Sequence, residues 1–200
     1  MLKVKICGVT NPADAAAAAE EGADYIGLIF APGSPRRLEP AAARRIVRGL
    51  PPGVEPVGVF RDQPLGEVLG ILRDAGLGLA QLHGDESPEY ARRLGVPVFK
   101  SFENHDEGTL GRMKDYEVFA FLLDVPKGSG GRVDPGWALR AKERGRIFLA
   151  GNLDPEAVAE LVARVRPFGV DGCSWMEKAP GVKDRAKVRA FIQAARAAFP

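Results

Sequence analysis

The chain alternates two kinds of segment along its whole length, and this alternation limits the folds open to it. Short runs rich in β-branched and aromatic residues predict strands, and alanine-, arginine- and glutamate-rich runs between them have the apolar spacing of helices. We predict eight strands, at Lys3–Cys7, Tyr25–Phe30, Val57–Phe60, Leu79–His83, Val96–Phe102, Val118–Asp124, Arg146–Ala150 and Gly169–Ser174. We predict eight helices, at Pro12–Glu21, Pro40–Leu50, Leu65–Ala75, Pro88–Leu94, Glu107–Lys114, Gly136–Lys142, Pro155–Arg166 and Asp184–Ala198.

A helix between every two strands requires crossover connections, which pair the strands in parallel. Eight such units normally close on themselves, so we predict an α/β fold, a single (β/α)8 TIM barrel over residues 1–200. A doubly wound open sheet is the alternative that the same pattern allows. Three helices begin with a polar residue and then proline, a pair that caps free backbone N–H groups, at Asn11-Pro12, Ser87-Pro88 and Asp154-Pro155.

Composition excludes several classes of partner and compartment. The 28 basic and 26 acidic residues are scattered and leave a net charge of only +2, so we expect neither nucleic acid nor a membrane surface as partner. No apolar stretch approaches the roughly 20 residues that span a bilayer. The start of the chain alternates as a strand does and does not resemble a signal peptide. Two cysteines, Cys7 and Cys173, are too few for a disulfide framework, which favours the reducing cytoplasm.

Polar side chains that can do chemistry end several predicted strands. Cys7 ends the first strand, His83 the fourth and Asp124 the sixth, while Arg36 lies in the loop after the second and Asn152 follows the seventh. One such residue would indicate only a helix cap. Their repetition at corresponding strand ends predicts an active site, because this face of a β/α barrel carries the chemistry.

Several short motifs follow one another in order over nearly the whole chain. They are Lys5-Ile6-Cys7-Gly8-Val9-Thr10, Gly22-Ala23-Asp24, Ser34-Pro35-Arg36, Val57-Gly58-Val59-Phe60, Gln81-Leu82-His83-Gly84, Leu122-Leu123-Asp124, Leu149-Ala150-Gly151, and Glu177 with Pro180-Gly181-Val182-Lys183-Asp184. Together they resemble the motifs of the phosphoribosylanthranilate isomerase family of tryptophan biosynthesis. The first stretch and Gln-Leu-His-Gly are together the most diagnostic. The resemblance implies a cofactor-free Amadori rearrangement of N-(5-phosphoribosyl)anthranilate to 1-(2-carboxyphenylamino)-1-deoxyribulose 5-phosphate.

The resemblance also assigns roles to individual residues. It implies that Cys7 is the base that removes the C2′ proton and that Asp124 is the acid that protonates the ring oxygen. Arg36 matches the position that binds the anthranilate carboxylate, and His83 is expected to bind substrate or orient the site. From the residues alone, Cys7 is more typical of a buried small hydrophobe than of a base, and His83 is nearly as typical of a structural histidine as of a substrate-binding one. Arg37 is expected on the solvated surface.

The two expected phosphate-binding loops depart from the family pattern. Gly151, Asn152, Ser174 and Trp175 occupy positions where the family usually has Gly-Gly and Ser-Gly. Asn tolerates a positive φ, but an indole at Trp175 would occupy space that glycine leaves for phosphate oxygens. The loop after strand five is also unusually polar, with Glu103, Asn104 and His105.

These departures keep other functions open. The chain could be a noncatalytic ligand-binding barrel, with Trp175 and Met176 lining an altered pocket. It could act on another sugar phosphate, as an epimerase or as indole-glycerol-phosphate synthase, in which case Lys100 is the strand lysine near the site. A metal site is a lesser alternative, because no compact ligand spacing joins the candidate residues. A disulfide between Cys7 and Cys173 is conceivable if strands one and eight pair. We expect a monomer or a homodimer.

Overall fold

The computed structural model of the chain describes residues 1–126 and 128–200. Its eight parallel strands are hydrogen-bonded in chain order, and β8 pairs with β1, so the sheet closes. The strands are β1 (Lys3–Cys7), β2 (Tyr25–Ile29), β3 (Glu55–Phe60), β4 (Ala80–Leu82), β5 (Val98–Phe102), β6 (Ala120–Leu123), β7 (Ile147–Leu149) and β8 (Gly169–Gly172). The predicted single (β/α)8 barrel is therefore confirmed, and the open sheet is excluded.

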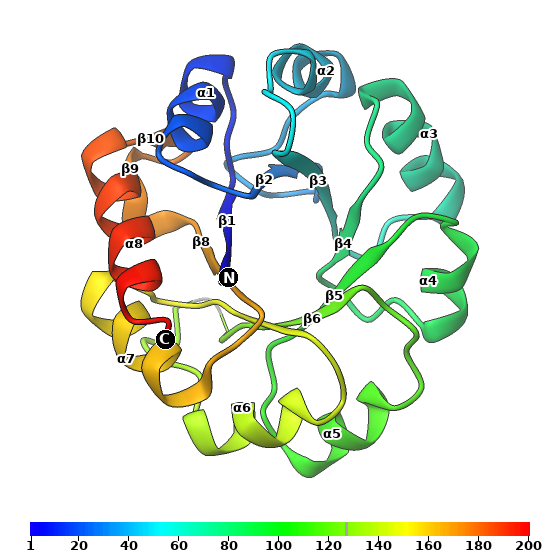
Figure 1. Ribbon diagram of the computed structural model, residues 1–200. Coiled ribbons are helices and arrows are strands. Elements are labelled where there is room, and N and C mark those ends of the chain that lie inside the picture. The colour runs from blue at the N-terminus through cyan, green and yellow to red at the C-terminus, as the bar shows by residue number, and fades with distance from the viewer. Residues whose placement is uncertain (127) are drawn as a thin grey trace.

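Eight α-helices form a ring outside the strands (Figure 1). They are α1 (Pro12–Glu20), α2 (Pro40–Arg48), α3 (Leu65–Ala75), α4 (Pro88–Arg93), α5 (Glu107–Met113), α6 (Pro135–Lys142), α7 (Pro155–Val165) and α8 (Arg185–Ala197). The three predicted caps are confirmed, because the side chains of Asn11, Ser87 and Asp154 each accept a hydrogen bond from a backbone N–H in the first turn.

The loop between β8 and α8 contains elements that the sequence pattern did not predict. A short 3-10 turn, η1 (Ser174–Met176), follows the strand, and β9 (Glu177–Ala179) then pairs with β10 (Val182–Lys183) in an antiparallel hairpin. The predicted eighth strand was therefore too long, since the chain leaves the barrel at Gly172. The hairpin returns Glu177 and Lys183 toward the mouth of the barrel, where they contact the site.

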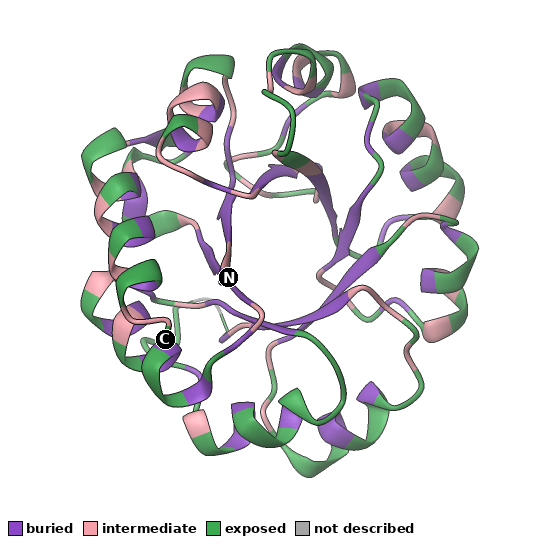
Figure 2. Cartoon of the chain, viewed as in Figure 1, coloured by how far each residue is buried: buried purple, intermediate pink, exposed green. Residues whose placement is uncertain are grey.

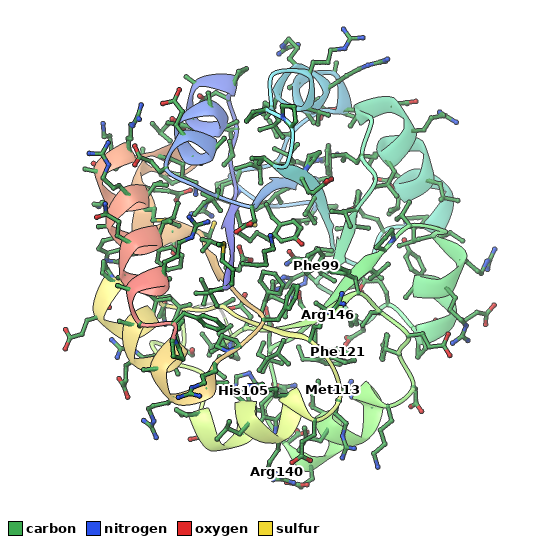
Figure 3. The ribbon with its side chains drawn as sticks, in the orientation of Figure 1. Phe99, His105, Met113, Phe121, Arg140 and Arg146 are labelled. Atoms are coloured by element: carbon green, nitrogen blue, oxygen red, sulfur yellow. The ribbon has the colours of Figure 1, made fainter. Side chains whose placement is uncertain are left out.

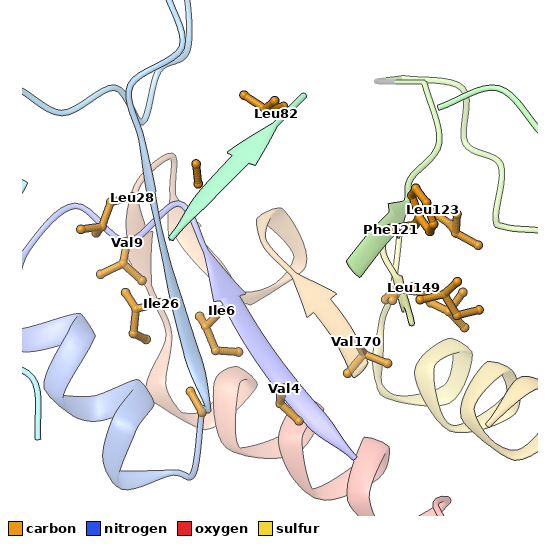
Figure 4. Packing of buried hydrophobic residues seen from close by; sticks show 14 of the residues in the cluster. Val4, Ile6, Val9, Ile26, Leu28, Leu82, Phe121, Leu123, Leu149 and Val170 are labelled. Atoms are coloured by element: carbon orange, nitrogen blue, oxygen red, sulfur yellow. The ribbon is translucent and has the colours of Figure 1, made fainter. Parts of the chain in front are cut away.

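Alternation along each strand separates two apolar layers. Val4 and Ile6 of β1 and Val170 of β8 point outward and pack with the helices (Figure 4). The inward side chains form a second cluster inside the barrel, to which Phe99 belongs (Figure 3). The members of this inner cluster are Tyr25, Val57, Leu79, Phe99, Ala120, Leu122, Phe148 and Ala150. The strands are buried, and the helices expose their outer faces (Figure 2).

The same alternation makes the carboxyl end of the barrel polar. Lys5 and Asp171 are buried next to the inner apolar cluster, on its side toward the carboxyl ends of the strands. The side chain of Gln81 on β4 donates a hydrogen bond to the hydroxyl of Ser101 on β5. These inward-facing residues support the floor of the cavity described next.

Candidate active site

A cavity of about 650 Å³ opens at the carboxyl ends of the strands. Its lining comes from β1, β2, β3, β4 and β8 and from the loops that follow β2 to β8. All the predicted site residues line this one cavity: Cys7, Arg36, His83, Asp124, Gly151, Asn152, Ser174 and Trp175. Residues as far apart in the chain as Cys7 and Trp175 are therefore brought to one site by closure of the barrel.

Asp124 follows directly on β6 and points into the cavity, as the inward positions Ala120 and Leu122 require. Its Oδ1 accepts a hydrogen bond of 2.8 Å from the backbone N–H of Val125, which orients the carboxyl group. Burial raises the pKa of Asp124, and the neighbouring His83 opposes this shift. The group is therefore better able than an exposed aspartate to hold a proton and deliver it.

His83 lies between the amide of Gln81 and two carboxylates. The Gln81 Nε2 group is 3.0 Å from His83 Nδ1, so Nδ1 accepts and the other ring nitrogen, Nε2, carries hydrogen. That Nε2 lies 3.2 Å from Glu103 Oε1 and 3.6 Å from Asp124 Oδ2. Burial lowers the pKa of His83, but Glu103 and Asp124 outweigh it and the net shift is upward. His83 thus links the polar loop after β5 to the carboxyl group of Asp124.

Cys7 and Cys173 lie side by side at the ends of two paired strands. The β1–β8 register pairs Lys5 with Asp171 and Ile6 with Gly172; Cys7 is the next residue and ends β1, and Cys173 is the first residue after β8. Both are free thiols and both line the cavity. On the other side of Cys7 lies Gly27 of β2, where a Cβ atom would come within 2.7 Å of the Cys7 sulfur.

The two neighbouring thiols shift each other's acidity in opposite directions. The Cys173 thiol, together with burial, raises the pKa of Cys7 well above its ordinary range. The Cys7 thiol lowers the pKa of Cys173 to about 7, with help from the charges of Lys183 and Arg36 and against the effect of burial. The predicted adjacency of strands one and eight is confirmed, and in this structure it produces a thiol pair.

A buried ion pair lies beneath the thiols. Lys5 Nζ donates a hydrogen bond of 2.8 Å to Asp171 Oδ2, and both side chains are buried. Burial raises the pKa of Asp171 to about 7, although the ammonium of Lys5 opposes the shift. The two partners are 166 residues apart in the chain and meet because β1 pairs with β8. The second oxygen of Asp171, Oδ1, is buried and has no hydrogen-bond partner among the residues that the structure describes.

The Arg36 side chain is held in place by Glu177 of the β9–β10 hairpin. Its Nε and Nη2 donate hydrogen bonds of 2.7 and 2.6 Å to the two carboxylate oxygens of Glu177. Glu177 Oε1 also accepts from Lys183 Nζ at 3.0 Å. The neighbouring Arg37 is exposed, as predicted. The guanidinium of Arg36 is therefore fixed at the cavity wall with part of its donor set still free.

The expected phosphate loops also line the cavity. Gly151 has φ +80°, and a Cβ there would come within 2.5 Å of Val125 Cγ2 and 2.8 Å of Asp124 Oδ1. Asn152 has φ +47°, which confirms that asparagine is accommodated, and its side chain donates to the Gly131 carbonyl at 2.9 Å. The Trp175 side chain lies at the rim, 36% exposed, with Lys187 Nζ 5.8 Å from its ring. The indole therefore lies at the edge of the cavity and does not fill it.

Lys100 does not line the cavity, but it lines a neighbouring pocket that shares Arg61, His83 and Glu103 with it. It follows the inward residue Phe99 on β5, so it points outward, where its Nζ donates to the Gly84 carbonyl at 2.5 Å and to Glu86 Oε2 at 3.1 Å. Lys100 is therefore a strand lysine near the site, as suggested, but its ammonium group is bound outside the cavity. Over the described ranges 1–126 and 128–200, no three His, Cys, Asp or Glu side chains gather as a metal site would require. The same ranges contain no helix with the length and apolarity to cross a membrane.

Several residues of the site had no role assigned from the sequence. Lys5, Glu177 and Lys183 were quoted only within the motifs, and Cys173 was considered only as a disulfide partner of Cys7. The structure brings all four to the thiols or to Arg36. The alternating pattern of Lys3–Cys7 could have predicted Lys5 as a residue of the site, because it places the Lys5 side chain on the same face of the strand as Cys7. No local pattern indicates that Glu177 meets Arg36.

Comparison with known proteins agrees with this geometry. The family model described as N-(5′-phosphoribosyl)anthranilate (PRA) isomerase matches residues 4–194. The isomerase of Geobacter sp. (strain M21) is 47% identical over 98% of both chains. The crystal structure of the isomerase from Thermus thermophilus is 43% identical, covers 98% of this chain and 99% of its own, and superposes with a TM-score of 0.90.

A second solved structure is described as phosphoribosyl anthranilate isomerase in complex with reduced 1-(o-carboxyphenylamino)-1-deoxyribulose 5-phosphate. It is 37% identical, covers 98% of this chain and 100% of its own, and has a TM-score of 0.90. The match to the family model and the identity over the whole length lead to one conclusion: the chain belongs to the N-(5′-phosphoribosyl)anthranilate isomerase family.

Proposed function

We propose that the cavity converts N-(5-phosphoribosyl)anthranilate to 1-(2-carboxyphenylamino)-1-deoxyribulose 5-phosphate, with Cys7 as base and Asp124 as acid. The observation that carries this assignment is that both groups line one cavity on the face where β/α barrels do their chemistry. The chain is an aldose–ketose isomerase of tryptophan biosynthesis, as its family membership states.

The reaction needs only proton transfers, which the two side chains divide between them. Asp124 gives its proton to the ring oxygen, and the sugar opens to an iminium at C1′. Cys7 then removes the C2′ proton, which leaves an enolamine. C1′ gains a proton and the C2′ hydroxyl loses one, so the carbonyl forms at C2′ and Asp124 recovers its proton. The raised pKa of Asp124 supports its part, because a carboxyl group must hold a proton in order to donate one.

The remaining residues bind the two ends of the substrate. Arg36 binds the anthranilate carboxylate through the N–H groups that Glu177 leaves free. The phosphate is bound by the loops after β7 and β8, at Gly151, Asn152, Ser174 and Trp175, where the barrel fold commonly binds phosphate through backbone N–H groups. His83 contacts the sugar between them and orients Asp124.

The physical setting follows from the same observations. Two adjacent free thiols, one of them the base, require a reducing compartment, so the protein acts in the cytoplasm. It works as a monomer or homodimer on a small phosphorylated substrate.

The test is an assay of the purified chain with freshly generated substrate, following the loss of anthranilate fluorescence. Turnover that saturates with substrate is expected. Tight binding of the substrate or of its reduced product without turnover would contradict the proposal and support a binding barrel. No binding at all would show that the rim residue Trp175 closes the phosphate site.

A Trp175→Gly variant and an Asn152→Gly variant refine the last of these outcomes. If the indole and the amide leave the phosphate site open, as the rim position of Trp175 indicates, neither change improves KM by more than about threefold. A larger gain would show that these side chains obstruct the phosphate.

A further inference from the structure

Glu103 lines the cavity, yet the reaction as written gives it no part. Alternation along β5 puts Glu103 on the inward face, because it follows Phe99 of the inner cluster and Ser101 at steps of two. The backbone N–H of Asp124 donates to the Phe102 carbonyl at 3.0 Å, so the residues directly after β5 and β6 are neighbours. Glu103 therefore lies next to the proposed acid, on the strand between β4 and β6.

The Nε2 atom of His83 faces two carboxyl groups at unequal distances. It lies 3.2 Å from Glu103 Oε1, within hydrogen-bond distance, and 3.6 Å from Asp124 Oδ2, beyond it. The contact of Nδ1 with Gln81 leaves a neutral imidazole one N–H, on Nε2, to share between the two carboxyl groups. Glu103 therefore takes the hydrogen bond, and the Asp124 carboxyl group lies near the ring without one from it.

The direction of this hydrogen bond decides how well Asp124 holds a proton. An N–H donated to a carboxylate stabilises its charged form, while a second negative charge nearby destabilises that form. Glu103 acts in the same direction on both counts, because it binds the N–H of His83 and because its charge adds to burial in raising the pKa of Asp124. Glu103 itself stays ionised at neutral pH, since its hydrogen bond with His83 holds its pKa below the ordinary 4.5.

We propose that Glu103 is a positioning residue that binds the N–H of His83 and so keeps Asp124 protonated until it meets the ring oxygen of the substrate. This proposal rests on the proposed function, in which Asp124 is the acid. Glu103 neither gains nor loses a proton during turnover, and the proton that Asp124 gives and recovers is the one already described. Without the Glu103 carboxylate, the Nε2–H group is free to turn to Asp124, which then ionises more easily.

Other charged or titratable groups also face these three side chains. They are Cys7, Lys5, Arg61, His105 and Asp171. Arg61 is the one on the far side of Glu103, with Nη2 4.0 Å from Oε2 and a side chain that is 56% exposed, so it contributes little. All of these groups remain when Glu103 is replaced, and a change in pH dependence therefore reports on Glu103.

The kinetic test compares the wild type with Glu103→Gln, which keeps the shape of the side chain and loses its charge, and with Glu103→Ala. Single-turnover rates with enzyme in excess report on the chemical step. The ratio of the wild-type rate to the variant rate should rise with pH, because less of Asp124 stays protonated in the variants. From about pH 5 we expect the ratio to reach about threefold or more by about pH 8, with KM changed by less than about twofold.

Glu107→Gln is the matched control. Glu107 is the next glutamate along the chain, and its ion pair with Arg140 is exposed and outside the cavity. Its removal should leave the single-turnover rate equal to that of the wild type at every pH. A ratio that is constant with pH in both Glu103 variants would overturn the proposal, since a merely structural role lowers the rate equally throughout.

Asp124→Asn separates this failure from a failure of the proposed function. If Asp124→Asn turns over at the wild-type rate, the assignment of the acid is wrong, and the role of Glu103 fails with it. If Asp124→Asn is inactive while the ratio for the Glu103 variants stays constant with pH, only the role of Glu103 is wrong.

Nuclear magnetic resonance of the imidazole rings tests the contact of His83 with Glu103 without substrate. The chain has two histidines, and the ring signals absent from a His83→Asn sample are those of His83. In the wild type the neutral ring should carry its hydrogen on Nε2. In both Glu103 variants the pKa of His83 should fall, because burial, which lowers it, is then opposed without the hydrogen bond and charge of Glu103. Equal pKa values for His83 in the three proteins would overturn the proposal.

Discussion

The guanidinium of Arg36 is bound by the carboxylate of Glu177, 141 residues later in the chain, through two hydrogen bonds of 2.7 and 2.6 Å. An arginine has five N–H donors, and this contact uses two of them. The contact joins the loop after β2 to the hairpin before α8, and so connects two walls of the cavity. Arg36 is consequently oriented before any ligand arrives.

Removal of the Glu177 charge should weaken substrate binding more than turnover. Glu177→Gln leaves one acceptor for Arg36 where there were two, so the guanidinium loses its fixed orientation. We expect KM to rise about tenfold, with kcat within about threefold, and the free energy of unfolding to fall by about 2 kcal/mol. Steady-state kinetics and urea unfolding measure the two effects. Glu160→Gln, which removes an exposed helical ion pair with Arg164, is the matched control and should change neither.

The same glutamate should contribute to acid sensitivity. Burial would raise the pKa of Glu177, but hydrogen bonds from Arg36 and Lys183 lower it below its ordinary 4.5. A lowered folded-state pKa gives stability that is present above the unfolded pKa and is lost as pH falls through the folded one. The difference in unfolding free energy between the wild type and Glu177→Gln should therefore be constant above about pH 5.5 and shrink below about pH 4.5. A difference that persists unchanged into acid would refute this ion pair as its source.

Loss of Lys5 should leave Asp171 as a buried carboxyl group with no counter-ion. We expect Lys5→Met to lower the free energy of unfolding by about 3–5 kcal/mol, because an unpaired buried charge is costly. The double variant Lys5→Met with Asp171→Asn should recover part of the loss, since no buried charge then remains. Urea unfolding at neutral pH measures both. If the double variant is no more stable than the single one, the cost arises from packing and the ion-pair explanation is wrong.

A methyl group at Gly151 should disturb the acid directly. The Cβ of Gly151→Ala would collide with Val125 Cγ2 and lie 2.8 Å from Asp124 Oδ1, so the carboxyl group must move. We expect a fall in kcat of about 10²-fold, the scale of a misplaced catalytic group. Gly95→Ala is the control, because Gly95 has φ +68° and nothing within 4 Å of its Cβ. It should lose comparable stability from the backbone strain and keep its kcat; equal kcat in the two variants would contradict the collision.

The fold was predictable because each strand–helix unit is encoded locally. Strand positions and the helix caps at Asn11, Ser87 and Asp154 follow from alternation and cap chemistry within a few residues. The residues at which strands end were less predictable, because the hydrogen bonds between two paired strands stop where the neighbouring strand ends. The predicted Leu79–His83 is shortened to β4, Ala80–Leu82, which pairs with Gly58–Phe60 of β3.

The site was predictable in its residues but not in its contacts. Strand ends and family motifs identified Cys7 and Asp124, because these residue types recur at the carboxyl face. The contacts of Lys5 with Asp171 and of Arg36 with Glu177 depend on barrel closure and on the β9–β10 hairpin. No local pattern predicts such long-range pairs, and the two strands of the hairpin are too short to give an alternating signal.

The central claim is that a thiol and a carboxyl group in one cavity divide the proton transfers. Its most direct measurement is the turnover number of Cys7→Ala and of Asp124→Asn, with melting temperature measured on the same samples. We expect each variant to lose about 10³-fold or more in kcat while its melting temperature stays within about 4 °C of the wild type. Turnover within about tenfold of the wild type in both variants would contradict the account.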